Sequence, residues 1–548
     1  MTAKSFSAYK QEDTEKYINM GWWTNETFGD IIDKASDLNA QEQALVDDKN
    51  RLTYGELADQ VDRLAAAFIG LGIQRGDHVL LQLPNWAEWV YSYFAIQKIG
   101  AMVVLLLTGH RQREINHFIS MTGATAWILP SQYRKTDYLP IISDVTETNE
   151  TMKDVILVRG EGSHKYHRLE ELLQETEING EVLRQIAHRA PHANEVASLV
   201  PTGGTTGLPK LAVRTHNDYI CGTRDKAESM ERGKDDIALI CTPVGHNLGL
   251  VMVTMTLLTF GKIVLLDSTR PEDICSTIEK EKVTFLNLVP ALLTRLVNFH
   301  RLKKYDLTSL KKIHVGAQHS PPELIKSAFE TIGVPNVISA FGMAEGPALN
   351  TRLSDTREII HTTVGKPCCP HDTYRVIDRN ENELPRNTEG EFIAKGPSIF
   401  CGYFGVDNRK TFTGDGFFKT GDLAIINKDG YVKITGRIKD IIIRGGENIS
   451  AIEVEELIIQ HPDVEDVAVI GIPDKELGEK VCACLQPIPG KTPDLHDIVS
   501  FLKRKGTGSF LIPERVEVVD RFPLTPAGKV DKKAMREEIK DRIKPDKR

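Results

Sequence analysis

The sequence predicts a multidomain α/β protein, and three observations support this fold class. A chain of 548 residues is too long for a single hydrophobic core, because domains average about 150 residues. Segments with strand-like and helix-like periodicity alternate along most of the chain, which is typical of α/β layers. Between about residues 375 and 436 the pattern changes to short strands separated by Gly, Asp and Asn turns. We therefore expect a large N-terminal domain over residues 1–436, with a β-rich subdomain at its end, and a small α+β C-terminal domain over residues 437–548.

Composition and charge limit the classes of protein to consider. The net charge is −8, which disfavours nucleic acid as the main partner because phosphates bind a basic surface. The longest apolar run, Met102 to Leu107, is too short to span a membrane, and the N-terminus lacks the apolar segment of a secretory signal. The eight cysteines lack the spacing of a disulfide framework or a zinc site. We expect a cytoplasmic protein that binds neither nucleic acid nor membrane; the sequence leaves its oligomeric state open.

The first elements with recognisable boundaries lie near the N-terminus. Thr53-Tyr-Gly-Glu56 has the pattern of a capping box, which predicts an amphipathic helix that ends near Gly70. The apolar run Val79 to Leu83 predicts a buried strand, and a helix is expected from about Trp86 to Ile99. Met102 to Leu107 predicts a second buried strand. A strand, a helix and a strand in this order indicate a βαβ unit within a parallel sheet.

The same alternation returns in the C-terminal part of the chain. Ser450-Ala-Ile-Glu453 predicts a second capping box and a helix that buries Ile452, Leu457 and Ile458. A strand is expected from Val467 to Ile472. Thr492-Pro493 is expected to begin a further helix that runs to Lys505.

The segment Thr202-Gly-Gly-Thr-Thr-Gly-Leu-Pro-Lys210 is the most informative stretch of the sequence. Its glycines allow the backbone to approach an anion closely, and successive N–H groups can bind phosphate oxygens. A Walker A loop is excluded, because Leu208-Pro209 separates the last glycine from Lys210 and Leu211 replaces the hydroxyl that binds the metal. The segment predicts a phosphate-binding loop, with a plain flexible turn as the alternative. The candidate phosphate-binding residues of this loop are Thr202, Gly203, Gly204, Thr205, Thr206, Gly207 and Lys210.

This segment and several others resemble the motifs of the adenylate-forming superfamily, which includes acyl-CoA synthetases, aryl-acid–AMP ligases and firefly luciferase. The matching segments occur in the order expected for that family and span nearly the whole chain. They are Thr202–Lys210, Phe341-Gly-Met-Ala-Glu345, Thr420-Gly-Asp422, Gly436-Arg437-Ile-Lys-Asp440, Arg444-Gly-Gly-Glu-Asn448 and Pro526-Ala-Gly-Lys529. With Trp22-Trp23 and Gly245-His246-Asn247, they make the chain look most similar to stand-alone 2,3-dihydroxybenzoate or salicylate ligases.

The resemblance implies ATP as a substrate, Mg²⁺ as the metal, and a role for each matching residue. Lys529 is expected to contact the α-phosphate and the acid carboxylate, where it stabilises charge that grows in the transition state. Glu345 is the expected Mg²⁺ ligand. Asp422 is expected to accept hydrogen bonds from both ribose hydroxyls, and Arg437 to lie against the ribose or a phosphate. Further adenylate contacts are expected from Gly316, Ala317, Gln318, Ala340, Phe341, Gly342, Met343 and Ala344.

The resemblance also implies a second half-reaction, in which a thiol attacks the adenylate. The small C-terminal domain is then expected to be mobile and to turn about Lys439. This movement would present the loop of Arg444, Gly445, Gly446 and Glu447 to the thiol. His246 is expected between the acid pocket and the thiol channel, with a packing histidine as the alternative.

The acid pocket is expected, by the same resemblance, at Asn247, Leu248, Val251 and Met252. Relatives specific for dihydroxybenzoate typically have Ser at the position of Met252, and a thioether cannot donate a hydrogen bond to a ring hydroxyl. An unpaired buried hydroxyl costs about 1–3 kcal/mol, which disfavours 2,3-dihydroxybenzoate. Ala317, where close relatives have Gly, should shorten the pocket. We therefore expect a compact acid such as benzoate, salicylate, anthranilate or an alicyclic acid, and Asn247 could bond its ortho substituent or its carboxylate.

The sequence therefore predicts an AMP-forming ligase that joins a small aromatic or alicyclic carboxylic acid to a thiol. CoA is the favoured acceptor, because stand-alone members of the superfamily are most often CoA ligases and Met252 departs from the siderophore-type pocket. An aryl-acid ligase that loads the phosphopantetheine of a separate carrier protein remains open. An inactive nucleotide-binding scaffold is a more remote alternative, which intact Lys529, Glu345 and Asp422 disfavour.

Overall fold

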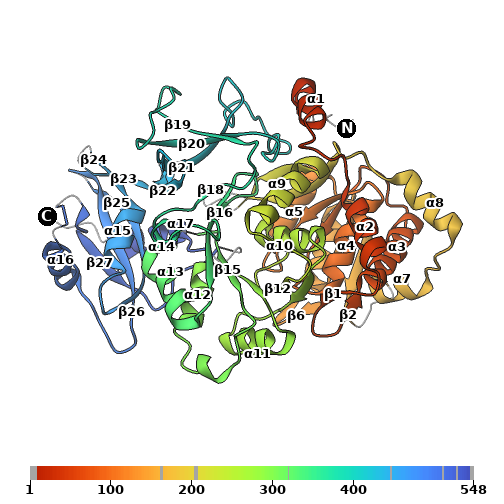
Figure 1. Ribbon diagram of the computed structural model, residues 1–548, viewed down its shortest axis with the longest axis horizontal. Helices are drawn as coiled ribbons and strands as arrows, with labels where there is room; N and C mark the ends of the chain where they lie inside the picture. The colour runs from red at the N-terminus through yellow and green to blue at the C-terminus, as the bar shows by residue number, and fades with distance from the viewer. Residues whose placement is uncertain are drawn as a thin grey trace. The chain divides into compact units, whose positions relative to one another are not determined.

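The computed structural model describes residues 9–160, 165–202, 208–318, 320–444, 447–474, 476–505, 507–508, 511–525 and 529–542. These residues belong to two compact units (Figure 1). The first unit takes its residues from 1–202, 208–373 and 395–412, and the second from 374–394 and 413–548. Both units combine helices with β-sheets, so the predicted fold class is confirmed.

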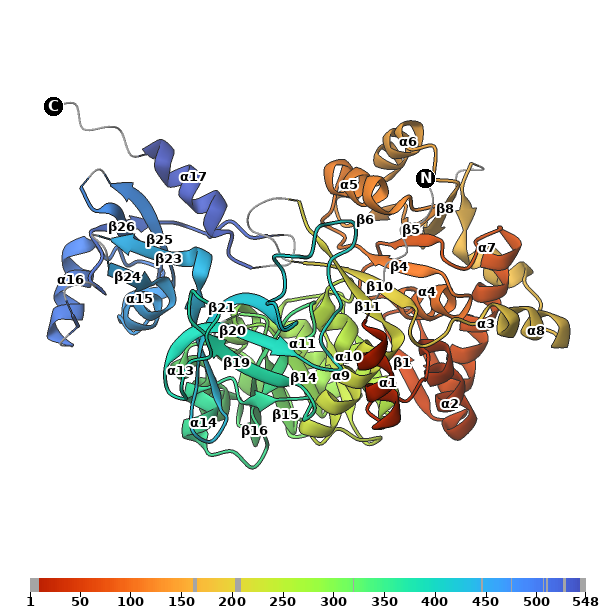
Figure 2. The same cartoon turned by 90° about the horizontal axis from the view of Figure 1, so that it is seen from above.

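The first unit contains a seven-stranded sheet whose central strands are parallel. Its order is β11-β10-β4-β3-β5-β8-β9. The strands are β3 (His78–Leu81), β4 (Met102–Leu105), β5 (Ala126–Pro130), β8 (Asp154–Val158), β9 (His167–Arg168), β10 (Val196–Pro201) and β11 (Leu211–Thr215). Helices α5 (Gln112–Thr122) and α6 (Leu139–Thr148) cover one face, and α3 (Tyr54–Gly70) and α4 (Ala87–Lys98) lie on the other (Figure 2).

The predicted βαβ unit is confirmed in this sheet. Helix α3 begins with the expected capping box, in which the Thr53 hydroxyl accepts from the Glu56 N–H at 3.2 Å and the Glu56 carboxylate accepts from the Thr53 N–H at 2.8 Å. Strands β3 and β4 pair in parallel on either side of α4 in the sequence. Gly100 follows α4 with a φ of +72°, which glycine adopts without strain.

The first unit also contains a nine-stranded sheet, with the order β18-β17-β16-β15-β14-β12-β13-β1-β2. The strands are β1 (Gln43–Val46), β2 (Arg51–Thr53), β12 (Ile237–Ile240), β13 (Lys262–Leu265), β14 (Phe285–Leu288), β15 (Lys312–Val315), β16 (Asn336–Gly342), β17 (Ala348–Asn350) and β18 (Lys366–Pro367). Strands β1 and β12–β16 pair in parallel with one another, whereas β2 and β17 pair antiparallel to β1 and β16. Their carboxyl ends therefore meet at one edge, where open α/β sheets bind ligands.

One hydrophobic core lies under this sheet, where apolar residues of its strands pack against four helices. The four are α11 (Pro271–Glu281), α12 (Pro290–Val297), α13 (Pro322–Ser327) and α14 (Arg357–Thr362). The other helices and strands of the first unit are α1 (Gln11–Asn19), α2 (Phe28–Asn39), β6 (Gln132–Tyr133), β7 (Thr136–Asp137), α7 (Leu169–Glu175), α8 (Gly180–Arg189), α9 (His216–Ser229) and α10 (Asn247–Leu258). No helix of the described ranges is long and apolar enough to cross a membrane.

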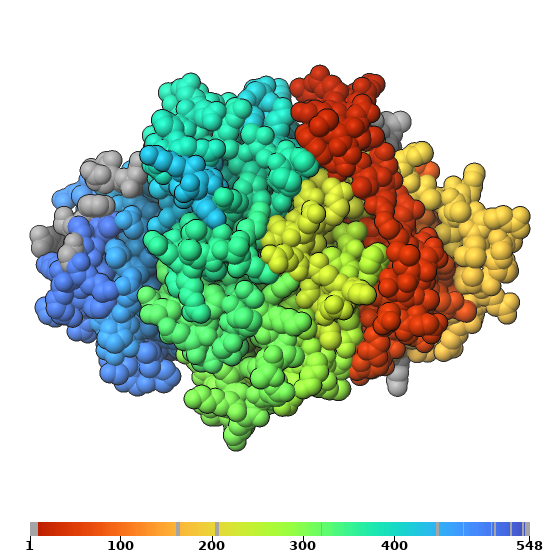
Figure 3. All heavy atoms as spheres, viewed as in Figure 1, coloured from red at the N-terminus to blue at the C-terminus, as the bar shows by residue number. Residues whose placement is uncertain are grey.

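The N-terminal segment, residues 9–23, belongs to the red part of the chain in Figure 3. Long-range hydrogen bonds fix it to the rest of the first unit. The Trp23 indole donates to the carbonyl of Pro397 at 2.9 Å, and the Tyr9 hydroxyl donates to that of Ile399 at 2.6 Å. Both contacts join this segment to the same short stretch of chain, residues 397–399.

The second unit contains two sheets. The first has the order β19-β20-β21-β22, with β19 (Thr373–Ile377), β20 (Glu389–Lys395), β21 (Phe418–Ile426) and β22 (Val432–Arg437). It confirms the short strands expected over 375–436. The second has the order β24-β23-β26-β25, with β27 beside β26: β23 (Ile441–Arg444), β24 (Glu447–Ser450), β25 (Val464–Asp474), β26 (Gly478–Pro487) and β27 (Arg515–Val518).

Successive side chains of β25 and β26 point to opposite faces of their sheet, so the C-terminal region has a hydrophobic core on each face. Val467 and Val469 face the core shared with α15 (Ala451–Ile458) and α16 (Leu495–Arg504). The alternate residues Ala468 and Ile470 face α17 (Lys532–Arg542).

Two details of the expected C-terminal helices are wrong. Helix α15 buries Ile458, as expected, together with Ala451 and Val454 on the same face, but it leaves Ile452 and Leu457 only half-buried. Helix α16 begins after Asp494, whose carboxylate accepts from the Asp497 N–H at 2.9 Å, so Thr492-Pro493 lies outside the helix.

The predicted domain boundary at residue 436 stays a prediction. The compact units group the β-rich segment with the C-terminal region, because β22 continues through a single 3-10 turn (Ile438–Asp440) into β23. The Ser450 hydroxyl also donates to the carbonyl of Thr435 at 2.5 Å, which ties β24 to β22.

Candidate active site

Three of the predicted site segments meet at the carboxyl edge of the nine-stranded sheet. His246 and Asn247 follow β12, Gly316–Gln318 follow β15, and Ala340–Glu345 end β16 and follow it. The side-chain amide of Asn247 donates to the carbonyl of Met343 at 3.3 Å. The parallel register of β12, β14, β15 and β16 thus brings together residues that lie far apart in the sequence.

Glu345 is held from two sides. It is 8% exposed, and its carboxylate accepts from the Tyr403 hydroxyl at 2.7 Å. Its backbone carbonyl accepts from the N–H of Phe400 at 2.8 Å. Burial and the adjacent Glu345 raise the pKa of Tyr403, so the hydroxyl keeps its proton and remains a donor.

Tyr403 connects two residues that the sequence assigned to one site. The ammonium group of Lys210 lies 4.6 Å from the centroid of the Tyr403 ring, within cation–π distance. The same tyrosine bonds Glu345, so it joins the end of the phosphate-loop segment to the predicted metal ligand. Tyr403 was not predicted as a site residue, because nothing in its local sequence relates it to Lys210 or Glu345.

Replacing Tyr403 with Phe tests this connection. The variant keeps the ring under Lys210 but removes the hydroxyl that orients Glu345. Partners that orient a metal ligand typically contribute a factor of about 10–100 in metal affinity. We therefore expect the Mg²⁺ concentration for half-maximal ATP–pyrophosphate exchange to rise about tenfold or more, while the KM of the acid stays constant. Tyr305→Phe, elsewhere in the first unit, is the control; a wild-type Mg²⁺ dependence of Tyr403→Phe would contradict the role.

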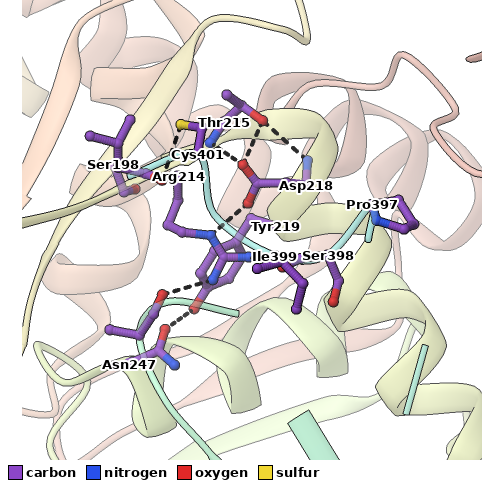
Figure 4. Close-up of polar contacts among 12 residues, drawn as sticks. Ser198, Arg214, Thr215, Asp218, Tyr219, Asn247, Pro397, Ser398, Ile399 and Cys401 are labelled. Atoms are coloured by element: carbon purple, nitrogen blue, oxygen red, sulfur yellow. Dashed lines mark hydrogen bonds and ion pairs between the residues drawn. The ribbon is translucent and has the colours of Figure 1, made fainter. Parts of the chain in front are cut away.

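Arg214 is the centre of a buried polar network beside the segment Ala340–Glu345 (Figure 4). It lies in β11, is 4% exposed, and donates to the Asp218 carboxylate at 2.6 Å. It also donates to the carbonyl of Ala344 at 2.9 Å and to that of Ser398 at 3.0 Å. Burial opposes its charge, but Asp218 raises the pKa of the guanidinium. Arg214 therefore fixes Ala344, the residue before Glu345. It also fixes Ser398, which lies in the stretch 397–399 that bonds the N-terminal segment.

Part of this network has a signal in the sequence. Thr215-His-Asn-Asp218 matches the spacing of a capping box, and the structure shows that box at the start of α9. The pattern could have located α9 and its first-turn carboxylate. It could not have shown that Arg214 reaches Ala344, which lies 130 residues away.

The predicted acid-pocket residues lie at the start of α10. The His246 imidazole accepts from the N–H of Leu248 at 3.2 Å and caps the helix. Leu248 and Val251 are half-buried, whereas Met252 is fully buried. The pocket itself, and the role of His246 beside it, stay predictions. Ala317 has a φ of +72°, a region that favours Gly.

The predicted phosphate loop is described only at its two ends. Thr202 follows β10, and its N–H donates to the carbonyl of Lys210 at 2.9 Å, just before β11 begins. The residues between them lie outside the described ranges: Gly203, Gly204, Thr205, Thr206 and Gly207. Strands β10 and β11 pair antiparallel up to Pro201 and Leu211.

The second unit brings its own predicted site residues together around Asp422. This carboxylate is 1% exposed, and its Oδ1 accepts from the Arg437 guanidinium at 2.7 Å. Burial raises the pKa of the carboxyl, whereas three nearby cations lower it: Arg437, Lys529 and Lys439. Burial, in turn, lowers the pKa of Lys439.

One oxygen of Asp422 is available for a ligand. Among the described residues, Oδ2 of Asp422 has no hydrogen-bond partner although it is buried. A buried acceptor without a donor costs about 1–3 kcal/mol, and a sugar hydroxyl supplies such a donor. The residues present therefore fit the predicted ribose contact.

The remaining predicted residues of the second unit are described only in part. The carbonyl of Lys529 accepts from the N–H of Thr525 at 2.7 Å, and Leu524 pairs with Val530. Arg444, at the end of β23, forms an ion pair with Glu514. Gly445, Gly446 and the side chain of Glu447 lie outside the described ranges.

Among the residues that the structure describes, two places have the chemistry to hold a metal. The carboxylate oxygens of Glu345 fit Mg²⁺, which prefers hard oxygen ligands. The second is a buried group of Cys221, Asp225 and Cys369, whose ligating atoms lie within 4.8 Å of one another. Arg224 already pairs with Asp225 at 3.2 Å, so this carboxylate is compensated without a metal ion. All eight cysteines are free thiols, as expected.

Comparison with known proteins gives the family. The model of AMP-binding enzymes matches residues 32–404, and that of the AMP-binding enzyme C-terminal domain matches residues 453–529. The chain belongs to the AMP-binding enzyme family. The predicted resemblance to adenylate-forming enzymes is thereby confirmed.

Individual AMP-binding enzymes are similar over nearly the full length. The 2,3-dihydroxybenzoate-AMP ligase of Bacillus subtilis is 36% identical over 98% of both chains. The salicyl-AMP ligase / salicyl-S-ArCP synthetase of Mycobacterium tuberculosis is 32% identical over 97% of this chain and 94% of that protein. The apo structure of Mycobacterium smegmatis MbtA superposes with a TM-score of 0.72 at 31% identity, covering 97% of this chain and 98% of that one.

Proposed function

We propose that this AMP-binding enzyme activates an aromatic acid with ATP and transfers the aryl group to the phosphopantetheine thiol of a carrier protein. The observation that carries the proposal is the similarity to an aryl-acid–AMP ligase over 98% of both chains. The name of the M. tuberculosis relative includes transfer of salicylate to ArCP, which supports a carrier as the acceptor. CoA, which the sequence analysis favoured, becomes the competing acceptor.

The proposed first step joins two negatively charged groups, so its chemistry is positioning and charge neutralisation. The acid carboxylate forms a bond to the α-phosphorus of ATP, and pyrophosphate leaves. Lys529 is proposed to neutralise charge on the reacting oxygens, and Oδ2 of Asp422 to accept from the ribose. Glu345 is proposed to hold Mg²⁺, which supplies positive charge to the phosphate oxygens when bound.

In the proposed second step the thiol sulfur forms a bond to the acyl carbon, AMP leaves, and the thiol proton is released. Lys439 is the proposed hinge, and Arg444 and Glu447 belong to the proposed thiol-side loop. His246 is proposed to lie between the acid pocket and the thiol channel. Its position at the start of α10, next to the predicted pocket residues, is compatible with this role.

The proposed acid is small and aromatic. Fully buried Met252 cannot donate a hydrogen bond to a ring hydroxyl, which continues to disfavour 2,3-dihydroxybenzoate even though a relative at 36% identity is named for it. Salicylate, benzoate and anthranilate remain the acids to compare, with an alicyclic acid as a further probe.

Acid-dependent ATP–pyrophosphate exchange tests the proposal. The purified chain is assayed with each acid of this panel, with 2,3-dihydroxybenzoate, and without acid. We expect exchange with at least one small aromatic acid and none without acid; no exchange with any acid would favour the inactive scaffold. The active acid is then offered with CoA or with a phosphopantetheinylated aryl carrier protein, and thioester formation only on CoA would overturn the proposed acceptor.

A further inference from the structure

Lys226 is a buried cation on α9. It is 7% exposed, and burial lowers the pKa of its ammonium group. Within the part of the chain that the structure describes, the group that counteracts this effect is the Cys368 thiol, and no carboxylate does. The thiol does not compensate the charge, because burial raises its pKa and it donates its proton to Oδ1 of Asn350. A buried charge is unfavourable unless a group of opposite charge lies beside it.

Other buried cations of the first unit show what Lys226 lacks. Arg214 pairs with the Asp218 carboxylate at 2.6 Å, and Arg232 pairs with that of Asp236 at 2.8 Å. Each of these guanidinium groups therefore has its counter-charge within the protein. Among the described residues no carboxylate plays this part for Lys226, so an anionic ligand is the group that would compensate it.

A buried ring nitrogen lies near this ammonium group. Burial lowers the pKa of His314, which is 1% exposed, and the charge of Lys226 lowers it further, so the two groups are close together. Ile313 and Val315 face the core with α11–α14, so His314 points to the opposite face of β15. Its Nδ1 lies 2.8 Å from Oδ1 of Asn287, whereas its Nε2 has no hydrogen-bond partner among the described residues.

Asn287 allows His314 to offer either an acceptor or a donor at Nε2. The amide donates through Nδ2 to the Thr242 hydroxyl at 2.9 Å, so His314 donates from Nδ1 to Oδ1, and Nε2 is an acceptor. A hydroxyl can also donate. With the amide turned over, Thr242 donates to its oxygen, Nδ2 donates to Nδ1 of His314, and Nε2 carries the proton. His314 can thus present an N–H to an anion while it remains neutral.

The two groups adjoin the predicted acid and adenylate site. A Cβ atom added to Gly316, a predicted adenylate contact, would lie 3.3 Å from Cε1 of His314. Lys226 follows Tyr219 by seven residues on α9, so both side chains lie on the same face of that helix. The Tyr219 hydroxyl donates to Oδ1 of Asn247, a predicted acid-pocket residue, at 2.8 Å (Figure 4).

We propose that Lys226 and His314 bind a second carboxylate of the acid that the enzyme adenylates. The inference rests on the proposed function and narrows its substrate class to aromatic dicarboxylic acids. The ammonium group of Lys226 supplies the opposite charge, and the imidazole of His314 supplies an N–H. A carboxylate has two oxygens, so it accepts from both groups at once. The other carboxylate of the acid reacts with ATP.

The test compares benzoate with phthalate, isophthalate and terephthalate in acid-dependent ATP–pyrophosphate exchange. The three dicarboxylates place the second carboxylate ortho, meta or para to the first, whereas benzoate lacks it. In wild type we expect the kcat/KM of at least one dicarboxylate to exceed that of benzoate by about tenfold to a hundredfold, the size of a hydrogen bond to a charged group.

Two variants remove the two groups in turn. Lys226→Met removes the charge and keeps a long unbranched side chain, and we expect the ratio of kcat/KM for the preferred dicarboxylate to that for benzoate to fall about tenfold or more. His314→Phe removes the ring nitrogens, and the ratio should fall about twofold to tenfold. Lys303→Met is the matched control, because it removes an exposed lysine of the same unit, and its ratio should equal that of wild type.

Urea denaturation gives a readout that does not depend on activity. Lys226→Met should raise the unfolding midpoint of the chain without ligand, because an apolar side chain replaces an uncompensated buried charge. The preferred dicarboxylate should raise the midpoint of wild type, because a ligand that binds the folded chain stabilises it, and should not raise that of Lys226→Met. A midpoint of unligated Lys226→Met at or below that of wild type would show that the charge is already compensated, and would overturn the inference.

Three further results would overturn the inference while leaving the proposed function intact. One is a set of dicarboxylates that all react no better than benzoate. Another is an equal loss on benzoate and on the preferred dicarboxylate in Lys226→Met, which indicates a purely structural residue. The third is a stimulation of benzoate exchange by acetate in wild type but not in Lys226→Met, which shows a free anion in place of the second carboxylate. A wild-type chain without exchange on any acid overturns the proposed function as well.

Discussion

Lys529→Ala is expected to reduce acid-dependent ATP–pyrophosphate exchange by a factor of about 10²–10³, the usual effect of removing one group that stabilises transition-state charge. Thioester formation from a preformed aryl-adenylate should be retained, because that step no longer needs a cation between the acid and the phosphate. The backbone of Lys529 is held by a main-chain bond from Thr525 and by the Leu524–Val530 pair. Truncating its side chain should therefore leave these backbone contacts in place.

Lys533→Ala is the matched control for this prediction. Lys533 lies four residues further along the chain and is exposed, so its removal changes the net charge by the same amount. Both half-reactions should proceed in this variant at wild-type rates. An equal loss of exchange and of thioester formation in Lys529→Ala would refute the separate role of the lysine in adenylation.

Arg214→Met is expected to destabilise the first unit by about 3–5 kcal/mol, the cost of breaking a buried ion pair by removing one partner. The substitution leaves the carboxylate of Asp218, which is 0% exposed, without its cation. It also removes the donors to the carbonyls of Ala344 and Ser398. The methionine fills much of the volume, so the loss is mainly electrostatic.

Tryptophan fluorescence during urea denaturation measures this effect selectively. All five tryptophans belong to the first unit: Trp22, Trp23, Trp86, Trp89 and Trp127. The unfolding midpoint of Arg214→Met should fall clearly below that of wild type. Arg409→Met removes an exposed partner of Asp407 in the same unit, and its midpoint should not move. Equal midpoints for Arg214→Met and wild type would show that burial of the pair costs as much as the pair contributes.

Local patterns predicted the elements whose cause is local. The capping box of α3, the glycine after α4 and the apolar runs of β3 and β4 act within a few residues, and the structure confirms each of them. Helix α16 shows the limit of such patterns. Thr492-Pro493 and Asp494 are adjacent candidates for its start, and the reciprocal bonds between Asp494 and Asp497 decide in favour of the aspartate.

The candidate site was predictable where motifs are continuous in sequence. Glu345, Asp422 and Lys529 were identified because each belongs to a short motif in a fixed order. Tyr403 was not, because it contacts Glu345 from another part of the chain. The separation between Tyr403 and Glu345 is 58 residues, and no periodicity connects them.

The sequence by itself determined the family, the order of the motifs and the α/β character of the chain, because these depend on residue types and spacings along the backbone. Only the tertiary structure decided which oxygen of Asp422 has no hydrogen-bond partner among the described residues, and how Arg214 supports Ala344, the residue next to Glu345. Hydrogen bonds in a buried region depend on direction and on the number of donors and acceptors within reach. Those quantities exist only after the parallel strands have brought distant segments to one edge.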